Sequence, residues 1–153
     1  RVECMVYSDA YTTDPIALFV GSGRAFPFAS WSELVSKRGV AMVGDSYGQE
    51  FDDFAESNLE LARVSTVAEA FALVAGGEAD YLLYSVYAGE DYLARTGQAG
   101  AYESLPTFVN EENFYITISK ASPFVTYLPQ INEAIAKYKA DGTIEGLIAQ
   151  YQQ

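Results

Sequence analysis

Short apolar runs and stretches with helical spacing alternate along the whole chain. The apolar runs, which predict strands, lie at residues 2–7, 16–20, 40–43, 59–65, 79–85 and 114–119. Apolar residues at helical spacing predict helices at about 31–37, 47–56, 67–75, 86–94, 124–138 and 144–151, with a kink or break in the 124–138 segment at its proline. Strands that alternate with helices indicate an α/β fold with a mainly parallel sheet and flanking helices.

The stretch 40–51 combines an apolar strand, a polar turn and the start of a helix. Gly44 and Gly48 bracket the turn. Ser46 and Gln49 have the spacing of a capping box, which predicts Ser46 as the N-cap of the helix. A turn that leads into a capped helix start presents backbone N–H groups, and these can hold an anion or a carboxylate.

The same turn also matches the G-x-S-x-G pattern, which makes Ser46 a candidate nucleophile. A nucleophilic serine needs a base to take its proton, and the chain has no histidine. A serine–lysine pair stays open through Lys37, Lys120, Lys137 or Lys139, although no motif places any of them beside Ser46. We therefore expect that the chain is not an enzyme, and that Ser46 is either a helix cap alone or a cap that also binds a ligand.

The composition excludes several classes of partner. The formal net charge of −12 argues against nucleic acid, because its phosphates would be repelled. No apolar run is long enough to span a membrane, so no direct membrane insertion is expected. Cys4 is the only cysteine and histidine is absent, which excludes an intrachain disulfide and a Cys-based zinc site. The acidic residues between 78 and 112 match no metal motif and predict a solvated face, so neither a metal nor a cofactor is expected.

Five sequence phrases follow one another along nearly the whole chain. They are Arg1–Tyr11, Trp31–Leu34, Val40–Ser46, the pair Thr66–Ala70 with Ala75–Asp80, and Ala140–Ile144 with Leu147 and Tyr151. In this order they resemble the bacterial periplasmic solute-binding proteins of family 3. Tyr7 and Ala10 replace a Phe and a Pro of the family's first phrase.

The resemblance implies a type II periplasmic binding fold, in which two α/β lobes joined by a hinge clamp a ligand between them. Residues 1–17 would be the hinge and a remnant of lobe 1, residues 18–116 the complete lobe 2, and residues 117–153 the return hinge strand and C-terminal helices of lobe 1. The family's opening segment has no counterpart here, and the chain starts with neither an initiator Met nor a signal peptide. We therefore expect a truncated, processed or excised chain, in which a domain-swapped dimer or a partner fragment completes lobe 1.

The resemblance also implies a set of ligand-binding residues. In amino-acid binders of the family, an Arg at the position of Arg1 grips the α-carboxylate, and the turn that matches Gly44–Ser46 donates hydrogen bonds to the same group. The Asp that usually holds the α-ammonium is replaced by Ser85, and a hydroxyl cannot offset a desolvated ammonium. Either the ligand lacks an ammonium, or another acid supplies the charge, or ordinary amino-acid binding is lost. The residues expected to bind ligand are Arg1, Tyr11, Gly44, Asp45, Ser46, Tyr47, Tyr84, Ser85 and Tyr87.

The implied function is that of a periplasmic solute-binding component of an ABC importer. Such a protein binds a small polar ligand, either amino-acid-like or a carboxylate, and delivers it to the transporter's permease. A ligand-sensing input domain of a signalling protein is the first alternative, because the same fold resembles those fused to signalling proteins. A dehydratase-type enzyme on this fold is the second, and the absence of histidine and of a convergent acid–base pair argues against it.

Overall fold

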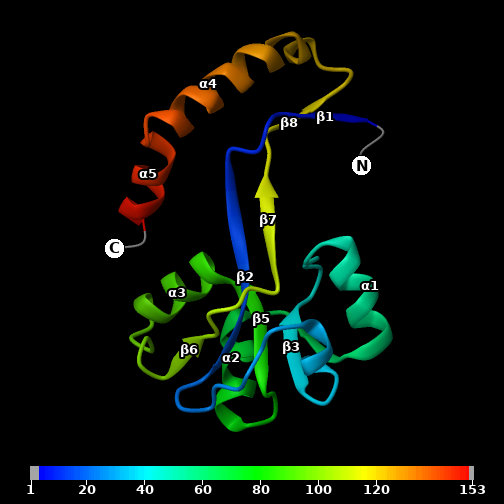
Figure 1. Cartoon of the computed structure of the whole chain (residues 1–153), viewed down its shortest axis with the longest axis vertical. Coiled ribbons are helices and arrows are strands. Elements are labelled where there is room, and N and C mark those ends of the chain that lie inside the picture. Colours follow the sequence, from blue (N-terminus) through cyan, green and yellow to red (C-terminus); the bar gives the residue numbers. More distant parts are fainter. Residues whose placement is uncertain (1–3, 152–153) are drawn as a thin grey trace. The chain divides into compact units, whose positions relative to one another are not determined.

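Residues 4–151 are described in the computed structural model, and they form two units joined by the strands β2 (Thr12–Gly21) and β7 (Asn110–Phe114) (Figure 1). Unit 2 takes in Pro15–Glu112, and unit 1 combines Arg1–Asp14 with Asn113–Gln153. Unit 2 thus begins and ends a few residues before the segment 18–116 that was expected to be lobe 2.

Unit 2 is built around a mixed sheet with the strand order β4-β3-β5-β2-β6, and β7 pairs with β2. Its further strands are β3 (Arg38–Met42), β4 (Glu60–Val64), β5 (Tyr81–Ser85) and β6 (Tyr102–Ser104). Strand β3 runs parallel to both β4 and β5, whereas β2 is antiparallel to β5 and β6. The α/β class is confirmed, but parallel pairing holds only for β4-β3-β5. Helix α1 connects β3 to β4 and helix α2 connects β4 to β5, and parallel neighbours need such crossover connections.

Three helices and one short 3-10 turn cover this sheet. They are η1 (Trp31–Leu34), α1 (Gln49–Asn58), α2 (Val67–Gly76) and α3 (Val86–Arg95). The helix expected over 31–37 is therefore only a single 3-10 turn. The start of α2 matches the expectation, because the Thr66 hydroxyl accepts a hydrogen bond from the Glu69 N–H at 3.2 Å.

The core of unit 2 lies on both faces of the sheet. Leu83 packs in one cluster with Phe51 of α1, and its neighbour Leu82 packs in a second cluster with Phe71 of α2. Successive side chains of a strand point to opposite faces, so a strand that is covered on both faces needs a continuous apolar run. This explains why the middle of β2 and residues Tyr81–Tyr84 of β5 are apolar without alternation.

Unit 1 pairs two short strands and carries the C-terminal helices. Its elements are β1 (Met5–Tyr7), β8 (Thr117–Ser119), the 3-10 turn η2 (Pro123–Tyr127), α4 (Leu128–Ala140) and α5 (Thr143–Tyr151). Strands β1 and β8 are antiparallel, with Val6 opposite Ile118. The expected break at Pro129 is confirmed: η2 and α4 are consecutive helices that meet one residue before it.

Unit 1 buries very little of its own apolar surface. Ile135 is the only buried hydrophobic residue in its described part. Most of the exposed large hydrophobic residues of the described chain belong to this unit: Tyr7, Phe114, Tyr115, Ile116, Phe124, Tyr127, Tyr138 and Leu147. Unit 1 carries four basic and six acidic side chains, against five and fifteen in unit 2. A nearly neutral surface with this much apolar area favours association with another chain.

We expect the 153-residue chain to self-associate through unit 1, so that its mass in solution rises above 16.7 kDa as concentration increases. Phe124→Ser combined with Tyr127→Ser should weaken this association, because these side chains are 65% and 56% exposed. Size exclusion with light scattering measures the mass. Phe108→Ser is the matched control in unit 2, where Phe108 is 42% exposed, and should leave the association unchanged. A folded monomer at every concentration would contradict this expectation.

Candidate ligand-binding site

A turn of residues 43–48 connects the end of β3 to the start of α1 and is called the 43–48 turn below. Gly44 and Gly48 both have positive φ, of 86° and 91°, which residues with a Cβ adopt only under strain. A Cβ at Gly48 would also lie 2.5 Å from Nδ2 of Asn110, whereas one at Gly44 would meet nothing within 4 Å. The two glycines are thus needed for the path of the backbone, and Gly48 also for a close approach to β7.

Arg63 of β4 holds the first half of the turn. Its Nη1 donates hydrogen bonds to the carbonyl oxygens of Met42, at 2.9 Å, and Asp45, at 3.0 Å. The guanidinium also lies over the ring of Tyr47, 5.7 Å from its centroid. A single cation therefore ties the end of β3 to the middle of the turn.

Asp52, in the first turns of α1, holds the second half. Its carboxylate accepts hydrogen bonds from the Ser46 hydroxyl, at 2.5 Å, and from the Tyr47 N–H, at 3.0 Å. The prediction of Ser46 as the N-cap is wrong: α1 begins at Gln49, and Gly48 occupies the cap position without a side-chain bond. Asp52 reaches back to the turn and accepts from donors there, which is the role that the expected capping box assigned to Gln49.

Tyr47 fixes the turn to the core of unit 2. Its side chain is only 2% exposed, and its hydroxyl donates to the carbonyl oxygen of Leu83 in β5, at 3.0 Å. Burial, and then the carboxylate of Asp45, raises the pKa of the Tyr47 phenol, so the hydroxyl stays protonated and donates this bond. Nδ2 of Asn110 donates to the Tyr47 carbonyl oxygen at 2.8 Å. Tyr47 thus contributes to the shape of the site, and its contact with a ligand stays a prediction.

Ser85 lies at the junction of β5 and α3 and is the N-cap of that helix. Its hydroxyl accepts a hydrogen bond from the Ala88 N–H at 3.1 Å. Tyr84 is half-buried against the second core cluster, and Tyr87 is half-buried in the first turn of α3. From the resemblance, Ser85 replaces the Asp that usually holds the ligand ammonium. In the structure, Ser85 also caps the start of α3.

The parallel pairing of β3 and β5 brings two groups of predicted site residues to one edge of the sheet. Val40 of β3 lies opposite Leu82 of β5, so both strands end side by side. Gly44, Asp45 and Ser46 follow the first strand, and Tyr84, Ser85 and Tyr87 end or follow the second. The carboxyl edge of parallel strands is where open α/β sheets bind their ligands.

The remaining two predicted residues belong to the other part of the chain. Tyr11 lies in unit 1, where its N–H donates to the Phe114 carbonyl oxygen at 3.0 Å and its ring lies 6.3 Å from that of Phe114. Arg1 lies outside the described residues.

The bonds of Ser46 bear on its role as a candidate nucleophile. The Ser46 hydroxyl donates a hydrogen bond to the Asp52 carboxylate, which also accepts one from the Tyr47 N–H. Two of the candidate lysines contact other groups: Lys37 lies over the ring of Phe26, and Lys139 donates to the Ala10 carbonyl oxygen. Between residues 4 and 151 no group of three or more His, Cys, Asp or Glu side chains could hold a metal ion. In the same range no helix is long and apolar enough to cross a membrane.

Sequence reasoning missed three residues that shape the site: Asp52, Arg63 and Asn110. Asp52 could have been found as an acid in the first turns of a helix, where carboxylates often bond free N–H groups. Arg63 and Asn110 act across 18 and 63 residues of sequence, and no local pattern points to them.

Solved structures with the same fold match almost the whole chain. A GluR0 ligand-binding core in complex with L-glutamate superposes with a TM-score of 0.78 at 15% identity, over 99% of this chain and 65% of that one. A variant of ArgBP from T. maritima gives 0.72 at 18% identity, over 99% and 63%. A putative ABC-transporter binding component from Wolinella succinogenes, complexed with lysine, gives 0.72 at 24% identity, over 95% and 62%.

These comparisons establish the fold. The chain has the type II periplasmic binding fold, as the resemblance of the five phrases implied. It spans less than two thirds of the length of the matched proteins. No family model and no curated protein matches the chain.

We expect Gly48→Ala to lower the free energy of unfolding of unit 2 more than Gly44→Ala does. Both variants place a Cβ on a positive φ, which costs ~1–3 kcal/mol. Only the Cβ at position 48 also displaces Asn110 from its bond with Tyr47. Urea unfolding followed by the fluorescence of Trp31, the only tryptophan, measures both values.

Asn110→Ala supplies the control, because it removes the atom that the new Cβ would meet. In that background the two glycine variants should differ by less than they do in the parent chain. An unchanged difference would show that Asn110 does not hold the turn.

Proposed function

We propose that this chain is the solute-binding component of an ABC importer. It would lie in the periplasm and deliver its ligand to the permease of the transporter. The 43–48 turn would supply its ligand contacts in unit 2. The observation that carries the proposal is the placement of this turn beside Ser85 at the carboxyl edge of β3 and β5. The turn is also clamped by Arg63, Asp52 and Asn110, and a preorganised site loses little entropy when a ligand binds.

The names of the matched structures support a small amino-acid-like ligand. One is a complex with L-glutamate, one is an arginine-bound ArgBP, and one is a complex with lysine. These proteins are binding proteins or binding cores, which favours binding over catalysis for this chain as well.

The charges around the turn favour a ligand that carries a positive group. Asp45 is exposed in the turn, and Glu50 and Asp52 follow in the first turns of α1, whereas Arg63 is the one cation bonded to the turn among the described residues. A dicarboxylate would be repelled by this field, and an ammonium or guanidinium would be attracted. A ligand carboxylate would accept hydrogen bonds from the turn, and Asp45 would supply the negative charge that Ser85 lacks.

A ligand-sensing input domain is the second candidate. The structure that superposes with a TM-score of 0.78 is named a ligand-binding core and not a transporter component, and this favours the second candidate. Both candidates use the same contacts in unit 2.

We expect L-lysine and L-arginine to raise the melting temperature of the chain more than L-glutamate, glutarate or cadaverine, because only the first two combine a carboxylate with a net positive charge. Asp45→Asn should weaken L-lysine binding by roughly tenfold, since a hydrogen bond to a charged group contributes about 1.5–3 kcal/mol. A thermal-shift screen followed by calorimetry measures both effects. Glu78→Gln removes the same charge just before β5, at the opposite end of that strand, and should leave the affinity unchanged.

Ser85→Asp compared with Ser85→Asn gives a second comparison at the same site. Both replacements are good N-caps, so α3 should be preserved in each. Only the Asp adds a charge for the ligand ammonium, and it should bind L-lysine more tightly than the Asn variant. Equal affinities, together with no effect of Asp45→Asn, would place the ligand elsewhere.

A further inference from the structure

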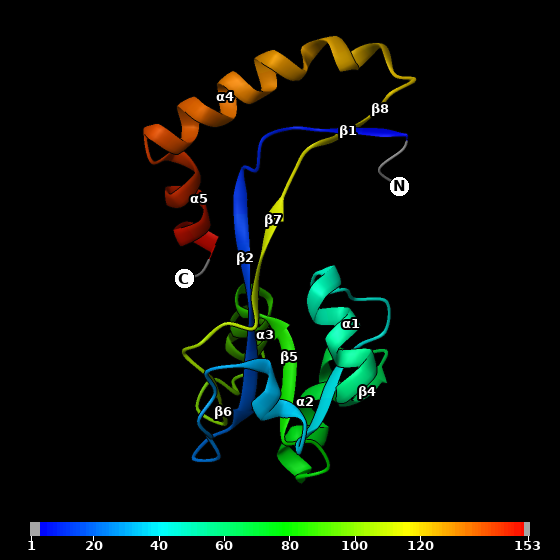
Figure 2. The same cartoon turned by 45° about the vertical axis from the view of Figure 1, so that its right-hand side comes forward.

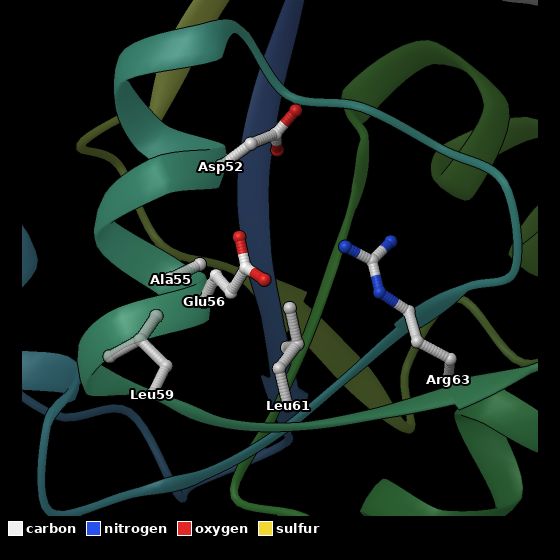
Figure 3. A pocket seen from close by; sticks show the side chains of 6 residues that line it. All are labelled: Asp52, Ala55, Glu56, Leu59, Leu61 and Arg63. Atoms are coloured by element: carbon white, nitrogen blue, oxygen red, sulfur yellow. The ribbon is translucent and has the colours of Figure 1, made fainter.

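Helix α1 and strand β4 lie near each other in unit 2 (Figure 2). An open pocket of about 440 Å³ lies between them (Figure 3). It is lined by Asp52, Ala55, Glu56, Leu59, Leu61 and Arg63. Volumes of about 300–1,000 Å³ are usual for pockets that bind small molecules. The predicted ligand-binding residues are not among its lining residues.

The two sides of this pocket carry opposite charges. Asp52 and Glu56 are four residues apart on α1, so their carboxylates lie on one face of the helix. Arg63 projects from β4 on the other side, and Figure 3 shows its guanidinium facing the carboxylate of Glu56. Arg63 forms no ion pair with either acid, and only its Nη1 is used by the 43–48 turn, which leaves Nε and Nη2 for other acceptors.

The rest of the lining is apolar. Ala55, Leu59 and Leu61 lie at the end of the pocket away from Asp52 (Figure 3). A molecule that matched all three features would have an ammonium, a carboxylate and a short aliphatic body. The ammonium would lie toward Glu56 and Asp52, the carboxylate toward Arg63, and the aliphatic body against the leucines.

We propose that this pocket is a second binding site, which takes a small zwitterion with an aliphatic side chain. Occupancy of the pocket changes the 43–48 turn, because Asp52 and Arg63 each contact both. An occupant that draws the Arg63 guanidinium toward its carboxylate competes with the carbonyl oxygens of Met42 and Asp45 for that cation. Binding in the pocket does not depend on the proposed function. The effect of the pocket's occupant on ligand affinity at the 43–48 turn rests on the proposed function.

The test is a titration of the isotope-labelled 153-residue chain with L-leucine, followed by the shifts of its backbone amide signals. We expect saturable shifts at residues 52–63 and, through Asp52 and Arg63, smaller ones at residues 43–48. Two probes define the ligand class: 4-methylpentanoate lacks the ammonium and 3-methylbutylamine lacks the carboxylate. Each should bind several-fold more weakly than L-leucine.

Glu56→Gln is the variant that separates the pocket from the proposed site. Glu56 lines the pocket and has no bond with the 43–48 turn, and the exposed side chain can change without loss of the fold. It should weaken L-leucine binding by about tenfold, the effect of losing one charge-assisted hydrogen bond. Glu50→Gln, on the same helix outside the pocket, should not.

Three outcomes would overturn the proposal. In the first, L-leucine shifts no signal at residues 52–63. In the second, Glu56→Gln leaves the affinity for L-leucine unchanged and Asp45→Asn abolishes L-leucine binding. That result would mean that L-leucine occupies the proposed site at the 43–48 turn, and only the pocket proposal would have failed. In the third, the two truncated probes bind as tightly as L-leucine. Pocket shifts without any change at residues 43–48 would overturn the coupling.

Discussion

The bonds that three side chains make to the 43–48 turn are the constraint on which the candidate site depends. Arg63 comes from β4, Asp52 from α1 and Asn110 from β7, and each bonds to the backbone of residues 42–47. A glycine-bracketed turn would otherwise sample many conformations, because glycine loses more conformational freedom on folding than any other residue. The three side chains therefore hold the turn in one conformation, and they link it to β4, to α1 and to the strand that leads toward unit 1.

Local patterns predicted the elements of unit 2 well, because each buried strand and amphipathic helix leaves its own periodicity. The end of β5 at Ser85 and the start of α2 at Val67 are examples. Pairing direction was harder to predict: β2 joins the sheet without a helical crossover, and its antiparallel register with β5 has no local signature. The helix expected at 31–37 is a single 3-10 turn. The Ser30 N–H donates to the Glu33 carboxylate as in a capping box, which marks where a helix starts and says little about its length.

The sequence predicted the turn between β3 and α1 but not the bonds within it, and the role of this turn as a ligand site stays a prediction. Gly44 and Gly48 were found because positive φ leaves a mark in the sequence. Ser46 was predicted as the N-cap of α1, but Gly48 occupies that position and the Ser46 hydroxyl donates to Asp52 instead. Arg63 and Asn110 are contacts between distant segments, and a single sequence contains nothing that pairs them. Ser85 was predicted as a site residue, and its role as the N-cap of α3 was not predicted.

In the proposed function, the 43–48 turn of unit 2 binds the carboxylate of a small, positively charged ligand. A crystal structure of the chain with the ligand that stabilises it most would show where that ligand lies. We expect a ligand carboxylate oxygen about 2.7–3.2 Å from a donor of residues 44–46, with the cationic group directed toward Asp45. A ligand bound away from residues 43–48, or one whose cation lies toward Arg63, would contradict it.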